Sequence, residues 1–486
     1  MIQVFNRGIQ SQRMRWQVTY TRRDFMRLAG LGVLSSFVVG RQSEGRGREV
    51  VTKPDRPNFI FILTDDQRHD AMGCAGNPLV RTPNIDSLAA RGVRFENAFV
   101  TLSICSPSRA ACLTGRYGSA TGVTSVPGTL KENEKTVAHY LKDARYRTGM
   151  VGKWHLGNSP AECGFGSATF FRSNGTYYNR KVLKNDEPST AEGYIEDYNA
   201  QRAIEFLYNG SSPFLLWLCT QVPHMDHTFD WPAREETLVR YDESQMPVPE
   251  TWQDDLQGRP AYLKEGRNRK QALRYGYDKA ENIRRHFKRY YAAITEMDAA
   301  IGRVLEAVDR LGLRDNTYIL FMGDNGWFMG EHAFTSKVLP YEESIRVPMI
   351  IAGPGIEPAT DSHLVLNIDL APTILELAQI GIPQNMHGSS LLRLLKDKET
   401  NWRESFLYEA PTPSLGSRPL LALRTQRYKL VQTFDVDEPS RVVFEELYDL
   451  QQDPKETKSL ADVPDYSNVL KRLRVQLKLA RNGIRR

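Results

Sequence analysis

The stretch Asn58-Phe59-Ile60-Phe61-Ile62-Leu63-Thr64 is a continuous apolar run that ends in the acidic pair Asp65-Asp66. An unbroken run of this kind is typical of a strand buried on both faces of a parallel sheet. Similar runs occur at 316–322, followed by Gly323-Asp324-Asn325, at 214–218, followed by Pro223-His224, and at 146–151, followed by Lys153-Trp154-His155. Four predicted strands therefore deliver polar groups just past their C-terminal ends.

Helical patterns separate these strands. Apolar residues recur at the spacing of one helix face in 82–92, 135–144, 198–208 and 282–311. Strands that alternate with helices predict an α/β fold with a large, mostly parallel central sheet sandwiched by helices. Because ligands of such sheets bind outside the carboxyl ends of the strands, we expect the four polar strand endings to converge on one site.

Outside this core the sequence changes character. Residues 225–280 lack clear periodicity and predict a long surface excursion near the mouth of the site, where a specificity loop is expected. After about 395 the chain turns to short alternating runs and a basic amphipathic helix at 468–480. We therefore expect a main domain at 57–395 and a smaller C-terminal α+β subdomain at 396–486.

The positive charge of the chain is concentrated at its N-terminus. The 486 residues include 64 Lys and Arg against 58 Asp and Glu, but residues 1–57 hold 11 of the former and 4 of the latter. The rest of the chain is close to neutral, so its charge gives no case for a nucleic-acid-binding protein.

The N-terminal segment itself resembles an export signal. Thr21-Arg22-Arg23-Asp24-Phe25 precedes an uncharged stretch at 28–40 that is too short to span a bilayer. The adjacent arginines resemble the twin-arginine export motif, with an ordinary basic signal or a retained signal anchor as the alternative. We expect a signal at 1–40, a linker at 41–56, export to the periplasm or the extracellular space, and no stable membrane insertion.

The cysteines do not indicate a disulfide framework. The chain has five of them, an odd number, without a C-x-x-C pair or a Cys/His cluster at zinc spacing. A dense disulfide scaffold and a structural zinc site are therefore not expected.

The most informative stretch is Cys105-Ser106-Pro107-Ser108-Arg109-Ala110-Ala111-Cys112-Leu113-Thr114-Gly115-Arg116. Its cysteine lies in a Ser/Pro turn at the start of a predicted helix, where the helix N-terminus and Arg109 would stabilise a nucleophilic or anionic group. Position by position, the string also resembles the signature of the formylglycine-dependent (type I) sulfatases of the alkaline phosphatase superfamily. The resemblance implies that a formylglycine-generating maturation enzyme converts Cys105 to Cα-formylglycine.

The two acidic strand endings match the metal site of that family. The resemblance implies metal ligands from Asp65 and Asp66, from Asp324 and Asn325, and from the modified Cys105. Oxygen ligands of this kind suit a hard cation such as Ca²⁺ or Mg²⁺ rather than zinc. The family usually binds calcium, so Ca²⁺ is the expected ion and Mg²⁺ the alternative.

Other polar residues also match the family's site. The resemblance implies that Arg109 and His155 hold the formylglycine, while Lys153, His224 and Lys337 contact the sulfate. It further implies that His224 protonates the leaving alkoxide as a general acid. The similarity runs from about Asn58 to Leu395 and is looser beyond, so that 57–395 is the expected sulfatase catalytic domain.

The implied activity is sulfuric ester hydrolysis. The segments 324–332 and 341–348 are similar to those of N-acetylglucosamine-6-sulfatase-like enzymes, so the expected substrate is a sulfated carbohydrate from glycosaminoglycan, mucin or algal polysaccharide. One alternative is a formylglycine-dependent phosphonate monoester or phosphodiester hydrolase of the same superfamily. Another is a catalytically silent protein that binds sulfated glycans, although the presence of every expected polar residue argues against it.

Overall fold

The computed structural model describes residues 56–397, 400–413 and 417–484. The expected export signal at 1–40, and the linker up to residue 55, lie outside the described residues. The division of the chain at residues 40, 56 and 395 stays a prediction. In the described ranges, no helix combines the length and the apolar character that a membrane crossing requires.

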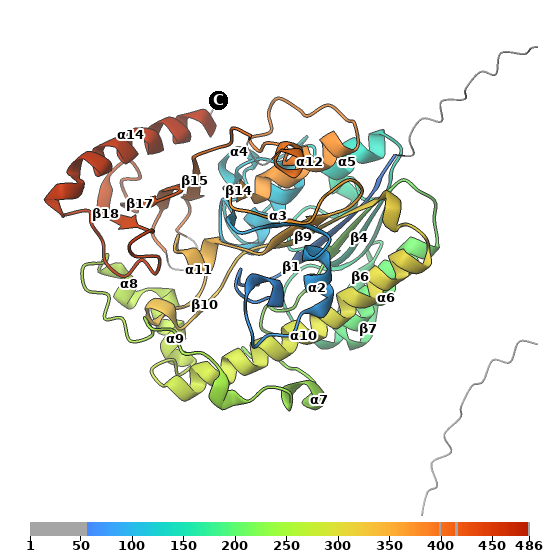
Figure 1. Ribbon diagram of the computed structural model, residues 1–486, viewed down its shortest axis with the longest axis horizontal. Helices are drawn as coiled ribbons and strands as arrows, with labels where there is room; N and C mark the ends of the chain where they lie inside the picture. The colour runs from blue at the N-terminus through green and yellow to red at the C-terminus, as the bar shows by residue number, and fades with distance from the viewer. Residues whose placement is uncertain (1–55, 398–399, 414–416, 485–486) are drawn as a thin grey trace, which may run out of the picture. The chain divides into compact units, whose positions relative to one another are not determined.

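A ten-stranded mixed sheet forms the centre of the described chain (Figure 1). Its strands are β1 (Asn58–Thr64), β2 (Gly92–Phe95), β4 (Arg147–Lys153), β5 (Ser167–Phe171), β6 (Tyr178–Lys184), β7 (Glu187–Tyr194), β8 (Phe214–Cys219), β9 (Thr317–Gly323), β12 (Met349–Ala352) and β13 (Ala359–Asp361). They lie in the order β13-β2-β12-β9-β1-β8-β4-β5-β6-β7. Strands β9, β1, β8, β4 and β5 run parallel, and antiparallel pairs occur toward both edges.

Strand β1 lies between β8 and β9 and is buried on both faces, as its apolar run predicts. Phe59, Phe61 and Leu63 pack in one core with α3 (Cys105–Thr114), α5 (Val137–Asp143) and α12 (Leu370–Leu377). Ile60 and Ile62 pack in a second core with α2 (Pro83–Ala89), α6 (Ile195–Tyr208) and α10 (Ala280–Arg310). Helices therefore cover both faces of the sheet, and the predicted α/β architecture is confirmed.

Residues 225–280 were predicted to form a surface excursion, but several of their side chains are buried in the core of the molecule. They form the short helices α7 (Glu235–Leu238), α8 (Tyr262–Glu265) and α9 (Arg267–Arg274). Trp231, Tyr241 and Tyr277 are buried in the core that also contains α10. The helices are too short for a clear hydrophobic period, which is why the sequence pattern did not reveal them.

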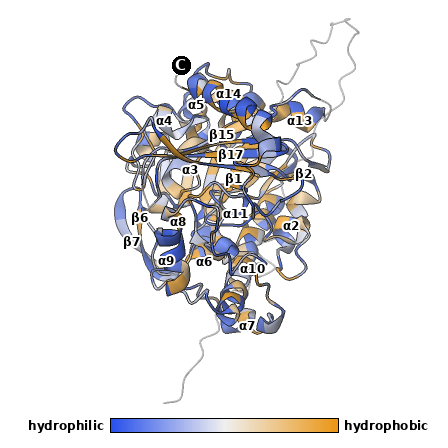
Figure 2. Ribbon diagram, turned by 90° about the vertical axis from the view of Figure 1, so that its left-hand side faces the viewer, coloured by the Kyte–Doolittle hydropathy of each residue, from blue (hydrophilic) through white to orange (hydrophobic). Residues whose placement is uncertain are grey.

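A second, antiparallel sheet follows in the C-terminal part. It consists of β15 (Ser405–Ala410), β16 (Leu420–Thr425), β17 (Tyr428–Phe434) and β18 (Val442–Asp449). Helix α14 (Ser467–Ile484) carries both hydrophobic and hydrophilic residues (Figure 2) and packs through Leu470, Leu473 and Leu477. The buried Lys429 ammonium of this sheet pairs with Glu342 of α11 (Glu342–Ile345) and with Glu456, which follows β18.

Burial of β1 on two faces predicts a large stability cost for truncating one of its side chains. The Phe61 ring is fully buried, and its centroid lies 4.2 Å from that of Trp217. We expect Phe61→Ala to lower the free energy of unfolding by about 3–5 kcal/mol, measured by urea denaturation. Val475→Ala, on a side chain that is 60% exposed, is the control and should change it by less than about 0.5 kcal/mol. Equal losses of unfolding free energy for Phe61→Ala and Val475→Ala would contradict the burial of β1 on both faces of the sheet.

Candidate active site

The C-terminal ends of the central parallel strands meet at one place, as predicted. Asp65 and Asp66 follow β1, Asp324 and Asn325 follow β9, Lys153 ends β4, and His224 follows β8. A pocket of about 230 Å³ opens here, and its lining includes Cys105, His155, His224, Trp327 and Lys337. All ten residues that the sequence singled out for the site are thus gathered around one pocket.

Cys105 is the first residue of α3 and is buried. Its Sγ lies 3.0 Å from Nζ of Lys337, 3.6 Å from Nζ of Lys153 and 3.5 Å from Oδ1 of Asp65. Burial, followed by the charge of Asp65, raises the pKa of the thiol to about 12. An unmodified thiol at this position therefore stays protonated at neutral pH and is a weak nucleophile.

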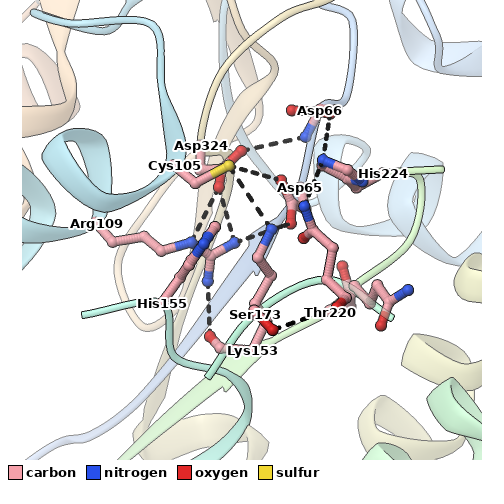
Figure 3. A network of polar contacts seen from close by, with 12 residues as sticks. Asp65, Asp66, Cys105, Arg109, Lys153, His155, Ser173, Thr220, His224 and Asp324 are labelled. Carbon is pink, nitrogen blue, oxygen red and sulfur yellow. Dashed lines mark hydrogen bonds and ion pairs between the residues drawn. The ribbon is translucent and has the colours of Figure 1, made fainter. Parts of the chain in front are cut away.

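Arg109 lies one turn further along α3 and joins three elements (Figure 3). Its Nε and Nη2 donate to Oδ2 of Asp324 at 3.0 and 2.7 Å, and its Nη1 donates to the carbonyl oxygen of Lys153 at 2.7 Å. Burial and the nearby Asp65 raise the pKa of Asp324 to about 6, against the opposing charge of Arg109. The guanidinium therefore binds α3 to the ends of β9 and β4.

Two lysines balance the acidic pair that follows β1. The ammonium of Lys153 pairs with Asp65, and that of Lys337 pairs with Asp66. Burial alone would raise the pKa of Asp65, but Lys153 and other nearby cationic groups hold it well below its usual range. Burial raises the pKa of Asp66 to about 6, because Lys337 only partly offsets the desolvation of the carboxylate and the charge of Asp65.

The acidic groups also form a candidate metal site. Ligand atoms of Asp65, Cys105 and Asp324 lie within 4.8 Å of one another. Asn325 Oδ1 is buried and accepts no hydrogen bond within the described residues, and Asp66 Oδ2 lies 3.4 Å from Nε2 of His224. Three carboxylates and an amide oxygen fit a hard divalent cation.

The end of β4 has a backbone that only glycine allows. Gly152 has φ 99°, and a Cβ at this position would lie 1.8 Å from the carbonyl oxygen of Cys219 in β8. Glycine therefore lets β4 approach β8 closely just before Lys153.

His155 lies shortly after the end of β4 and has φ 61°. Burial together with Lys153 lowers the pKa of its imidazole to about 2. The neutral ring has a buried Nδ1 without a hydrogen-bond partner among the described residues.

His224 presents one nitrogen to the pocket. Its Nδ1 lies 2.6 Å from the carbonyl oxygen of Met225, so Nδ1 carries a proton, and its Nε2 lies 2.8 Å from Nδ2 of Asn174. Burial and the charge of Lys153 lower the pKa of His224 to about 3.

Several lining residues were not predicted from the sequence. They are Asn174, Asp226, Phe229, Arg267, Gln271 and Tyr275. Five of them belong to 225–280, so the expectation that this segment lies near the site mouth is confirmed. Asn174 lies in the Ser-Asn-Gly turn after β5, and this turn is the one local signal that could have drawn attention to it.

Comparison with known sequences gives consistent matches. Residues 57–380 match the sulfatase family, and residues 330–483 match the family described as N-sulphoglucosamine sulphohydrolase, C-terminal. The N-acetylglucosamine-6-O-sulfatase of Bacteroides thetaiotaomicron is 29% identical, with 86% of this chain and 85% of that protein covered.

Solved structures agree with these matches. A structure described as a complex with its substrate, D-glucosamine-2-N,6-O-disulfate, has a TM-score of 0.80 and 27% identity, with 88% of this chain and 98% of that chain covered. The phosphonate monoester hydrolase of Agrobacterium radiobacter shares the fold, with a TM-score of 0.72, 21% identity and coverage of 88% and 96%. Because the family match spans more than half of the sequence, this chain belongs to the sulfatase family.

Proposed function

We propose that this sulfatase releases sulfate from a sulfated carbohydrate, with formylglycine at position 105 and one bound Ca²⁺, for which Mg²⁺ is the alternative. The observation that carries the proposal is the position of Cys105 Sγ beside two ammonium groups and a buried acidic cluster at the pocket. The carbohydrate substrate is supported by the similarity to an N-acetylglucosamine-6-O-sulfatase and to a structure that holds a disulfated glucosamine.

The motif that begins at Cys105, and the position of Cys105 Sγ beside Lys153 and Lys337, support a modified residue at this position. A hydrated aldehyde supplies two hydroxyl groups on one carbon, of which one can attack sulfur and the other can release the sulfate as the aldehyde reforms. Asp65, Asp66, Asp324 and Asn325 would hold the proposed ion, which would supply positive charge next to the sulfate.

The remaining charges of the site suit a sulfate monoester. A sulfate ester is an anion that resists attack by a nucleophile, so its charge must be neutralised. Lys153 and Lys337, both within 3.6 Å of Cys105 Sγ, supply this charge next to the reacting residue. Arg109 keeps Asp324 in place. His155 lines the same pocket as Cys105 and is the proposed acceptor of a proton from residue 105, a role that requires the negative charge of the bound sulfate to raise its lowered pKa.

His224 suits the role of general acid at the leaving oxygen. The negative charge of a bound sulfate ester opposes the effect of Lys153 and raises the pKa of the imidazole. Asn174 accommodates the change, because a 180° rotation of its amide would present an oxygen to a protonated Nε2. The side chain therefore suits either protonation state of His224.

A phosphonate monoester or phosphodiester hydrolase with formylglycine is the second candidate. The phosphonate monoester hydrolase of similar fold is only 21% identical, so it supports the fold and not the activity. Release of sulfate and of phosphonate, measured on a panel of sulfated sugars and phosphonate esters, separates the two candidate activities.

We also propose that the protein is exported to the periplasm or the extracellular space. A formylglycine-generating enzyme would carry out the maturation of Cys105.

Activity should depend on modification of Cys105. Protein made in a host with the maturation enzyme should release sulfate, and mass spectrometry of the peptide that contains residue 105 should show formylglycine or its hydrate. Protein from a host without that enzyme, and Cys105→Ala, should be inactive. Cys74→Ala, at a half-buried cysteine outside the pocket, is the control and should remain active. Full activity of protein that carries a thiol at 105 would refute the proposed nucleophile.

Activity should also depend on a divalent ion. We expect Asp65→Ala or Asp324→Ala to abolish turnover, because each removes a buried carboxylate from the proposed ligand set. Chelation should remove activity reversibly until Ca²⁺ or Mg²⁺ is restored. Asp143→Ala, on a carboxylate that is 68% exposed, should leave turnover unchanged. An enzyme that keeps its activity after complete removal of metal would disprove the ligand assignment.

His224 and Lys153 should differ in their dependence on the leaving group. A sugar alkoxide needs protonation, while nitrophenolate leaves unaided, and general-acid catalysis contributes about 10²–10⁴-fold where it is needed. His224→Ala should therefore reduce kcat far more on a sugar sulfate than on nitrophenyl sulfate. Lys153→Ala should reduce both to a similar degree, because both substrates carry the sulfate. Equal losses for His224→Ala would assign the acid to another residue.

A further inference from the structure

The backbone around Lys337 is in an unfavourable conformation. Ser336, which ends β11 (Thr335–Ser336), has φ 73°, and Val338 has φ 84°. Left-handed conformations of non-glycine residues cost about 1–3 kcal/mol each and persist only where the surrounding structure imposes them. A neighbouring element must therefore hold the backbone on either side of Lys337.

Asn268 makes hydrogen bonds at this place. Its side-chain Nδ2 donates to the carbonyl oxygen of Thr335 at 2.8 Å and to that of Lys337 at 3.0 Å. The two N–H groups of one amide thus bridge the carbonyls on either side of Ser336. Asn268 is 8% exposed, although it belongs to α9, a hydrophilic helix (Figure 2). Its inward-facing amide is therefore buried against the Lys337 segment.

Other contacts also hold this segment: β11 pairs with β10 (Phe328–Met329), and the hydroxyl of Tyr408 donates to the carbonyl oxygen of Val338. The ammonium of Lys337 has contacts of its own. That ammonium lies 3.0 Å from Cys105 Sγ, pairs with Asp66 and lies 5.6 Å from the centroid of the Trp327 ring. In the proposed site Asp66 would bind the ion, and the backbone of the segment is then a contact that still places Lys337 beside residue 105. A shift of about 1 Å in such a group can cost about 10²-fold in rate.

We propose that Asn268 is a positioning residue, which sets the Lys337 ammonium beside residue 105 by holding the carbonyls of Thr335 and Lys337. The inference rests on the proposed function, in which Lys337 contacts the sulfate. In this proposal a residue of the segment 225–280 acts in the reaction through Lys337, in addition to the residues of that segment that line the pocket.

A double-mutant cycle tests whether Asn268 acts through Lys337. Asn268→Ala should lower kcat/KM for a sulfate ester by about 10–100-fold. In the Lys337→Ala background, the same change should cost less than about threefold, since the group that it positions is gone. Additive losses, or an unchanged rate for Asn268→Ala, would overturn the proposal. Lys270→Ala, at an exposed position on α9, is the matched control and should leave the rate unchanged.

Two further measurements keep the test decisive. Asn268→Gln retains an amide donor and should recover part of the rate, and it serves as the second variant if Asn268→Ala does not fold. If the wild type releases no sulfate from any ester, the proposed function fails. The positioning role is then read from crystal structures, in which the Asn268 variant should show Lys337 Nζ displaced from residue 105. An unmoved Nζ would overturn the inference.

Discussion

Mutual compensation of buried charges is the constraint on which the site depends. Asp65, Asp66 and Asp324 are almost completely buried close together, and each would be costly there without an opposite charge. Lys153, Lys337 and Arg109 supply that charge, and they come from three separate elements. The sheet brings the ends of β1, β4 and β9 together, and Arg109 of α3 and Lys337 supply charge that offsets the cost of burying the carboxylates there.

Several residues of the site have unfavourable backbone conformations. Asp66, His155 and Ser336 all have positive φ values, and Gly152 occurs where a side chain would collide with β8. Such conformations are typical of functional sites, where the surrounding structure maintains them. Here the neighbours that do so include Asn268, whose two hydrogen bonds span Ser336. The polar groups of the pocket are consequently oriented before any substrate arrives, which lowers the reorganisation that catalysis requires.

Similarity to other proteins and the chemistry of the site answer different questions. The fold alone is shared with a phosphonate monoester hydrolase, so it does not distinguish the reactions. The family match and the groups around Cys105 favour sulfate ester chemistry. The lining of the pocket also includes Arg267, Gln271 and Tyr275 from the segment 225–280.

The sequence by itself determined the central strands and the ten polar residues that the structure gathers at the pocket. Unbroken apolar runs identify strands that are buried on both faces, and the string from Cys105 to Arg116 is a local motif, so neither depends on distant contacts. Tertiary structure alone decided the positions of Asn174 and Asn268. Asn268 lies 69 residues from Lys337 in the sequence, in a helix with no clear period, and its partners are backbone carbonyls, which every residue has. No residue pattern can encode such a contact, because it arises only when the chain has folded.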